Sequence, residues 1–217
     1  MENKVRRQKA LSIAYKTLFA AYCLGAWTCM FRYIGNGDCY HLWLCVLAPA
    51  IPVAVVLLFR ALKLRFTWHL NLVIMIFITL AYLLGSCVDL YHSLPGYDKF
   101  IHSVSGLFVS LLCCVAYYFI KSSHALEALD ARILPVFVFC GSMTVAGLWE
   151  IWEYVMSGLT GQDLQFVAET GVSDTMQDMI CCLVGTIAFL PSAVRLGNGK
   201  GDWLTGAVSD FIEQNYH

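Results

Sequence analysis

The sequence predicts an all-α polytopic membrane protein: a bundle of six transmembrane helices with both the N- and the C-terminus in the cytoplasm. Composition supports this fold class first, because 59% of the 217 residues are hydrophobic and only 13% are charged. A soluble domain carries about 25% charged residues. The mean hydropathy is +0.66. In addition, apolar stretches recur at the length of about 20 residues that a helix needs to cross the hydrocarbon layer.

Six apolar stretches qualify as membrane spans. They lack the alternation of strands, and helices satisfy their own backbone hydrogen bonds in lipid. The expected spans run approximately over residues 11–31, 40–59, 68–88, 100–120, 133–156 and 174–194. Pro49 and Pro52 lie in the second span, where we expect a kink, because proline has no amide hydrogen to donate. Residues 1–197 are therefore interpreted as one transmembrane domain.

Residues 198–217 are expected to form a short cytoplasmic tail. From Asp202 onward its apolar side chains share one helical face, which is typical of an amphipathic helix on a membrane surface. A loosely ordered tail is the alternative.

The distribution of basic residues predicts the orientation. Of the fourteen Lys and Arg residues, eleven fall on one side of the predicted membrane, whereas only Arg32 and Lys99 fall on the other. Lys and Arg accumulate on the cytoplasmic side, so both termini are placed there. The first apolar stretch is too long for a signal peptide and is interpreted as a retained anchor. We therefore expect a multi-pass protein of the inner (plasma) membrane.

Several functional classes are excluded by composition and motifs. The formal net charge is −1 and no basic patch is present, so we expect no nucleic-acid partner. The sequence contains no nucleotide-binding glycine loop and no serine-hydrolase elbow. The ten cysteines show no zinc-binding spacing. Cys39 and Cys87 both lie toward the predicted outer side, and whether they form a disulfide stays open.

Ionisable residues inside the spans occur in pairs at helical spacing. The pairs are Asp98 with His102, Glu150 with Glu153, and Asp174 with Asp178. A separation of three or four residues places both members on one helix face. The predicted topology brings all three pairs, from three helices, to one layer near the outer boundary. Because charged groups inside a membrane are costly, they indicate a functional site, and we expect one outward-facing pocket.

These carboxylates cannot all be charged in a low dielectric without a counter-ion or shared protons. A divalent metal ion (Mg²⁺, Mn²⁺ or Zn²⁺) is one solution, and a proton relay is the other. The expected metal ligands are Glu150, Glu153, Asp174, Asp178 and His102. The expected catalytic residues are His102, Asp98 and Glu150, with His102 as a ligand or general acid/base that Asp98 orients. Lys99 is the only base nearby, and its long stem could also carry the ammonium outward.

The motifs resemble a known family. They are Tyr97-Asp98-Lys99-Phe100-Ile101-His102 followed by Gly106, Trp149-Glu150-Ile151-Trp152-Glu153, and Asp174-Thr175 with Asp178-Met179 and Gly185. In order and spacing they resemble the YjdF-type inner-membrane proteins, and in outline the VanZ-like proteins. The resemblance implies an integral protein of the bacterial cell envelope. VanZ-like proteins are associated with glycopeptide resistance, but where they tend to place an amide this chain has Glu153 and Asp178, which favours a cation.

Three functions are compatible with these observations. The leading hypothesis is an envelope protein with an outward-facing acidic and histidine site, assisted by a metal, that acts on or binds a lipid or lipid-linked headgroup. The first alternative is a small proton-coupled transporter that uses the same carboxylates. The second is a scaffold whose polar residues only hold helices together. Membrane lipids are the expected partners in the leading hypothesis. The substrate, the existence of a reaction and the oligomeric state are left open by the sequence.

Overall fold

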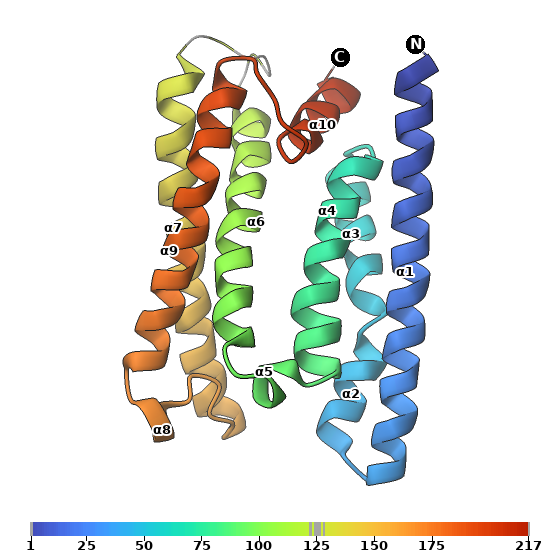
Figure 1. The fold of residues 1–217 in the computed structure, drawn as a ribbon, viewed down its shortest axis with the longest axis vertical. Coiled ribbons are helices and arrows are strands. Elements are labelled where there is room, and N and C mark those ends of the chain that lie inside the picture. Colours follow the sequence, from blue (N-terminus) through green and yellow to red (C-terminus); the bar gives the residue numbers. More distant parts are fainter. Residues whose placement is uncertain (1, 122, 124–126, 128, 217) are drawn as a thin grey trace. The chain divides into compact units, whose positions relative to one another are not determined.

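The computed structural model describes residues 2–121, 123, 127 and 129–216, which are organised as helices with no strand among them. Met1 and His217, the outermost residues of the predicted domain and tail, lie outside this description. The chain forms two compact units (Figure 1): unit 1 comprises Met1–Tyr97 and Gly206–His217, and unit 2 comprises Asp98–Thr205. The predicted all-helical fold is confirmed.

Five helical segments of the described chain are long and apolar enough to cross a membrane. They are Cys39–Ala61, Trp68–Cys87, Tyr97–Ile120, Asp130–Thr160 and Ser173–Gly197. Helix α1 (Glu2–Asn36) contains the stretch predicted as a further span, but it is the least apolar of the long helices and is not among the five. The chain therefore has the helices of a multi-pass membrane protein, five by this criterion.

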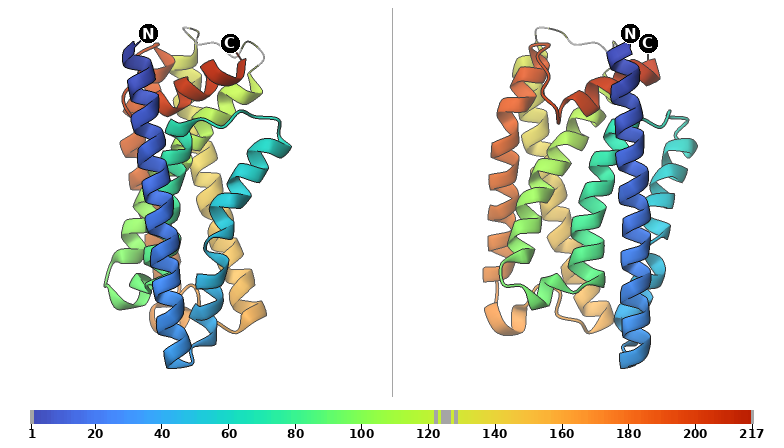
Figure 2. Two further views of the ribbon diagram at one scale, coloured as in Figure 1. Left: turned by 90° about the vertical axis from the view of Figure 1, so that its right-hand side faces the viewer. Right: turned by 45° about the vertical axis from the view of Figure 1, so that its right-hand side comes forward.

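Unit 1 contains the first half of the chain and its C-terminal helix. After α1 come α2 (Cys39–Leu47), α3 (Ala50–Ala61), α4 (Trp68–Ile78), the π-helix η1 (Thr79–Cys87) and α5 (Leu90–Ser93), and α10 (Gly206–Tyr216) completes the unit. Helix α1 packs along α2 and α4 (Figure 2). The predicted kink is present as a break between α2 and α3 at Pro49.

The third predicted span, residues 68–88, changes from α-helical to π-helical hydrogen bonding along its length. Residues 79–87 adopt π-helical hydrogen bonding, which the apolar composition of this stretch does not reveal. The aromatic ring of Tyr91 packs against Gly85, where a Cβ atom would lie 2.3 Å from the ring. All ten cysteines lie in the described part and are free thiols. Cys39 is exposed and Cys87 is buried, so the disulfide that the sequence left open is not formed.

The C-terminal helix α10 docks onto α4 within unit 1. Its buried face consists of Ala207, Val208 and Phe211. Beside this face, Asp210 Oδ2 lies 2.9 Å from a guanidinium nitrogen of Arg7 and 3.0 Å from His69 Nδ1. Burial acts to raise the pKa of Asp210, but the hydrogen bond with His69 and the charge of Arg7 outweigh it and lower this pKa below its ordinary value.

A lowered pKa in the folded chain means that Asp210 stabilises α10 docking above its ordinary pKa of 3.8. This contribution is lost as the pH falls through the lowered folded value. We expect Asp210→Asn to remove the pH dependence and, at neutral pH, to make amide hydrogen exchange in α10 roughly tenfold faster. Exchange rates corrected for intrinsic chemistry provide the measurement. Glu213→Gln is the control, because both side chains of its ion pair with Lys4 are more than half exposed to solvent and such a pair contributes little. Equal effects of the two variants would contradict this account.

Unit 2 is built around three long helices. These are α6 (Tyr97–Ile120), α7 (Asp130–Thr160) and α9 (Ser173–Gly197), with the short α8 (Val167–Thr170) before α9. Helices α6 and α9 run in the same direction, and α7 runs opposite to them and packs against α9 (Figure 1).

Helices α6 and α9 come into backbone contact at two glycines. A Cβ atom on Gly106 would lie 2.2 Å from the carbonyl oxygen of Cys182, and a Cβ on Gly185 would lie 1.9 Å from that of Ser103. Small residues permit this close approach of helices in membranes. From α7, the hydroxyl of Ser142 donates to the carbonyl of Gly106 at 3.4 Å and shares a hydrogen bond with Thr186 Oγ1 at 2.8 Å at the same level. The three helices are therefore fixed to one another at this level.

We expect Gly106→Ala and Gly185→Ala each to destabilise the protein by about 1–3 kcal/mol, because the added methyl group meets backbone and not a flexible side chain. Thermal unfolding in detergent measures this effect. Gly147→Ala in α7 is the matched control, since a Cβ there meets no atom within 4 Å, and it should leave stability unchanged or raise it. If all three variants unfold alike, the close contact does not exist.

Candidate functional site

The ammonium group of Lys99 lies among three carboxylates at one end of unit 2. Its Nζ donates to Asp98 Oδ2 at 3.0 Å and to Asp174 Oδ1 at 2.5 Å, and it meets both oxygens of Asp178 at 2.8 and 2.9 Å. Together with His102, these residues are called the Lys99 cluster below. The Lys99 side chain therefore points toward the carboxylates and not outward from the cluster.

Helix geometry explains why these residues meet. Lys99 precedes Gly106 by seven residues, and Asp178 precedes Gly185 by seven. Seven residues are about two helical turns, so each charged residue lies on the same helix face as its contact glycine. Because α6 and α9 run in parallel from the same end, Lys99 and Asp178 face each other two turns from the contact. Asp174, one turn before Asp178, completes the enclosure of the ammonium group.

His102 lies on the inner side of the cluster. Its Nε2 atom is 3.5 Å from Asp98 Oδ1 and 3.7 Å from Asp178 Oδ1, distances longer than those of good hydrogen bonds. Its Nδ1 atom lies 3.7 Å from the Sγ of Cys182. His102 and Asp178 are both buried. One ligand atom each from Asp98, His102 and Asp178 lies within 4.8 Å of the others, so this group could hold a metal ion.

Charge balance in the cluster is incomplete. Three carboxylates face one ammonium group, and the side chains are only 2–24% exposed. A buried excess of negative charge is costly, so a proton on His102 or an additional cation would stabilise the arrangement. Asp98 and Asp178, which hold the Lys99 ammonium, also belong to the group that could hold a metal ion.

Glu150 belongs to a second polar group beside the cluster. The amide Nε2 of Gln165 donates to the Glu150 carbonyl at 3.1 Å, to its carboxylate Oε2 at 3.4 Å and to Thr175 Oγ1 at 3.1 Å. Gln165 and Glu150 are both buried. Gln165 thus joins α7 to the first turn of α9, and Thr175 follows directly after Asp174 of the cluster.

Glu153 is placed differently from the other predicted ligands. Its carboxylate accepts a hydrogen bond at 2.7 Å from the indole of Trp149, one turn away on the same helix. Within the described residues, no hydrogen bond or ion pair joins Glu153 or Glu150 to the Lys99 cluster. The structure therefore brings Asp98, His102, Asp174 and Asp178 together, and it leaves the two glutamates outside that cluster.

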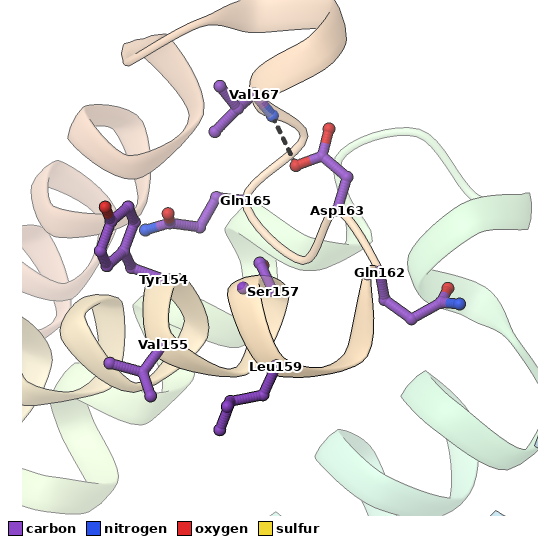
Figure 3. Close-up of a pocket in the computed structure, with 10 residues that line it drawn as sticks. Tyr154, Val155, Ser157, Leu159, Gln162, Asp163, Gln165 and Val167 are labelled. Carbon is purple, nitrogen blue, oxygen red and sulfur yellow. Dashed lines mark hydrogen bonds between the residues drawn. The ribbon is translucent and has the colours of Figure 1, made fainter.

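A pocket of about 570 Å³ opens next to Gln165. The end of α7 and the loop that follows it form its walls, and Figure 3 shows Tyr154, Val155 and Leu159 on one side and Gln162 and Asp163 on the other. The Asp163 carboxylate holds the loop by accepting the backbone N–H groups of Val167 and Ala168 at 2.9 and 2.8 Å. No residue of the Lys99 cluster lines the pocket. Gln165 lies between the two.

Two features of the site go beyond the sequence prediction. The central place of Lys99 could have been found from the matched seven-residue spacings to Gly106 and Gly185. Gln165 had no comparable signal, because its position depends on the path of an irregular loop.

Comparison with known proteins identifies a family. The sequence model of DUF2238, described as a predicted membrane protein, matches residues 16–198. The match confirms the resemblance to YjdF-type proteins, which this family comprises. No curated protein and no solved structure matches the chain.

Proposed function

The chain belongs to the DUF2238 family of predicted membrane proteins, and we propose that it binds the polar headgroup of a membrane lipid or lipid-linked molecule, with a divalent cation at the Lys99 cluster. One observation carries this proposal: ligand atoms of Asp98, His102 and Asp178, from two helices, converge within 4.8 Å of one another. Two carboxylates and an imidazole suit Mg²⁺, Mn²⁺ or Zn²⁺. A phosphate-bearing headgroup would supply further oxygen ligands.

The proposal includes a membrane topology. Helix α1 is the sixth span, both termini are cytoplasmic, and the cluster lies near the outer surface of the inner (plasma) membrane. The basic residues of the sequence support this orientation. Within unit 1, the ion pairs of Lys4 with Glu213 and of Arg7 with Asp210 join the two chain ends. Ends that lie on one side of a membrane require an even number of crossings, as α1 together with the five apolar segments provides.

In this function Lys99 acts as a built-in counter-ion. A metal ion and the Lys99 ammonium cannot both occupy the space between Asp98 and Asp178. Entry of the metal therefore displaces the ammonium, and the flexible four-carbon stem of lysine allows such a movement. The displaced ammonium is then available to pair with a headgroup phosphate. His102, beside two carboxylates, is placed to bind the metal or to transfer a proton as a general acid/base.

Glu150 and Gln165 have a supporting role in the proposal. A headgroup in the pocket would contact Gln165, whose amide is hydrogen-bonded to both Glu150 and Thr175 of α9. A bound metal would polarise a phosphoryl oxygen or activate water. The predicted catalytic role of Glu150 and the ligand role of Glu153 depend on movement of these side chains toward the cluster.

Packing below the cluster favours a binding site over a transporter. Gly106 packs against the backbone of Cys182 and Gly185 against the backbone of Ser103, and the Ser142–Thr186 hydrogen bond lies beside these contacts. A proton-coupled transporter would need a polar route past this level. The scaffold alternative accounts for the Lys99 ion pairs, but it gives no role to the surplus negative charge around them.

Lys99→Met in the purified full-length protein tests the cation proposal. The substitution leaves three carboxylates without their ammonium partner, and loss of one partner of a buried pair costs about 3 kcal/mol. We therefore expect a lower thermal midpoint in chelator-treated detergent solution. We also expect Mn²⁺ to restore stability with a saturable dependence on its concentration, because the metal takes the place of the ammonium.

Two further variants make the result specific. Lys99→Met/Asp178→Asn should be more stable than Lys99→Met without metal, and it should lose the response to Mn²⁺. Lys99→Met/Glu169→Gln is the matched control, since Glu169 is an exposed acid of α8, and it should keep the response. If Mn²⁺ fails to stabilise Lys99→Met, the cluster is a structural network and the cation proposal is wrong. Profiling of lipids and cell-wall precursors in a deletion strain then identifies the headgroup, with the looser VanZ-like similarity directing attention to those precursors.

A further inference from the structure

A cavity of about 420 Å³ opens in unit 1, apart from the Lys99 cluster, whose residues belong to unit 2. Its walls come from α1, from α3, from the connection between α3 and α4, and from the first residue of α4. The aromatic and basic residues that line it are Tyr15, Lys16, Phe59, Arg60, Phe66 and Trp68. The proposed headgroup site makes no use of this cavity.

Helix α3 packs loosely beside the cavity. Pro52 is its only buried residue, and every residue of α3 is described. In the left view of Figure 2, α3 diverges from α1 toward its C-terminal end, where Arg60 lies. Val56, Phe59 and Arg60 are three and four residues apart, so they share the helix face that lines the cavity. The cavity therefore occupies the space left between α1 and α3.

Three aromatic rings form a packed wall of the cavity. Phe66 meets Tyr15 and Trp68 edge-on, with ring centroids 5.5 and 5.0 Å apart, and Tyr15 lies 5.8 Å from Trp68. The ammonium group of Lys16 lies over Trp68, 5.4 Å from the ring centroid, which is a cation–π contact. The cavity thus combines an apolar wall with a cation that this wall helps to position.

The two cations of the cavity have no anionic partner in the described part of the chain. Among the described residues, none of those that line the cavity is acidic, and none forms an ion pair or hydrogen bond with the side chain of Lys16 or Arg60. Arg7, elsewhere in unit 1, is by contrast paired with Asp210. An anion in the cavity would therefore supply a counter-ion to both cations.

We propose that this cavity binds one anionic phospholipid, with Arg60 and Lys16 on its phosphodiester and the apolar lining along an acyl chain. A guanidinium group matches a phosphate with two parallel hydrogen bonds, and an ammonium group adds a compact charge. Val56, Phe59 and Leu64 provide the apolar surface. Basic pockets between membrane helices on the cytoplasmic side bind anionic headgroups. In the topology proposed above, this end of unit 1 faces the cytoplasmic leaflet.

A zwitterionic lipid fits the cavity less well. Aromatic rings also bind quaternary ammonium groups such as choline, but the Lys16 ammonium already lies over Trp68. The choline group would add a further positive charge beside Lys16 and Arg60, with no carboxylate in the described lining to offset it. The charges of the cavity therefore favour a headgroup of net negative charge, such as phosphatidylglycerol.

Native mass spectrometry of the full chain in a neutral detergent tests the proposal. The delipidated protein is titrated with phosphatidylglycerol or phosphatidylcholine, and the bound lipids are counted per chain. We expect one tightly bound phosphatidylglycerol and weaker binding of phosphatidylcholine. Arg60→Gln and Lys16→Gln should each weaken phosphatidylglycerol binding about tenfold, because each removes a charge-assisted hydrogen bond. Both side chains are exposed, so the variants should fold like the parent protein.

Lys9→Gln and Arg132→Gln are the matched controls. Each removes an exposed basic residue that does not line the cavity, and each should leave the affinity for phosphatidylglycerol within about twofold. Equal weakening by all four variants would show attraction to overall charge and overturn the specific site. Tighter binding of phosphatidylcholine than of phosphatidylglycerol would overturn it as well.

Inorganic phosphate distinguishes a lipid site from a site for free phosphate. In excess, it should displace no more phosphatidylglycerol than sodium chloride of equal ionic strength does, because the apolar lining also holds the lipid. Full displacement by phosphate would contradict the lipid proposal. Lys16 and Arg60 lie in unit 1, so loss of this site should leave the Mn²⁺ response of Lys99→Met unchanged, which keeps the two proposals separate.

Discussion

The backbone contact between α6 and α9 at Gly106 and Gly185 sets the geometry on which the rest of unit 2 depends. At this point each helix meets the carbonyl groups of the other, and any side chain would force them apart. When two parallel helices touch at one point, residues that lie the same number of turns from this point on each helix face each other. The charges placed two turns before the contact on each helix, Lys99 and Asp178, are therefore obliged to meet.

The ion pair between Lys99 and Asp178 is important for stability because the surroundings of buried groups have a low dielectric constant. A lone carboxylate as buried as Asp178 is costly, and so is a lone ammonium. Paired, they stabilise the start of both helices and specify their register. The same pairing explains why the cluster is suited to cations: its oxygens already converge on one positive charge. In the proposed function, the ion pair and the metal-bound site would be two states of one arrangement, distinguished by which cation is present.

The helical architecture could be predicted because membrane helices are apolar along a recognisable length. The convergence of Asp98, His102, Asp174 and Asp178 could also be predicted, because helical spacing and a common depth were sufficient. A common depth was not sufficient to predict the contacts of Glu153. It lies on the expected helix, but its carboxylate accepts a hydrogen bond from Trp149 of the same helix. The direction of Lys99 was undecided because its stem can reach either way. The position of Gln165 and the π-helix over residues 79–87 depend on packing, for which composition carries no signal.

Disulfide trapping tests the central contact most directly. Ser105 Oγ on α6 lies 3.4 Å from Cys182 Sγ on α9, so a cysteine at position 105 would have a thiol partner already in place. We expect Ser105→Cys to cross-link to Cys182 in membranes under mild oxidation, detected by mass spectrometry of the linked peptides, whereas Thr144→Cys on the exposed face of α7 should not. A Ser105→Cys protein in which both thiols stay open to alkylation would contradict the packing of α6 against α9, and with it the assembly of the Lys99 cluster.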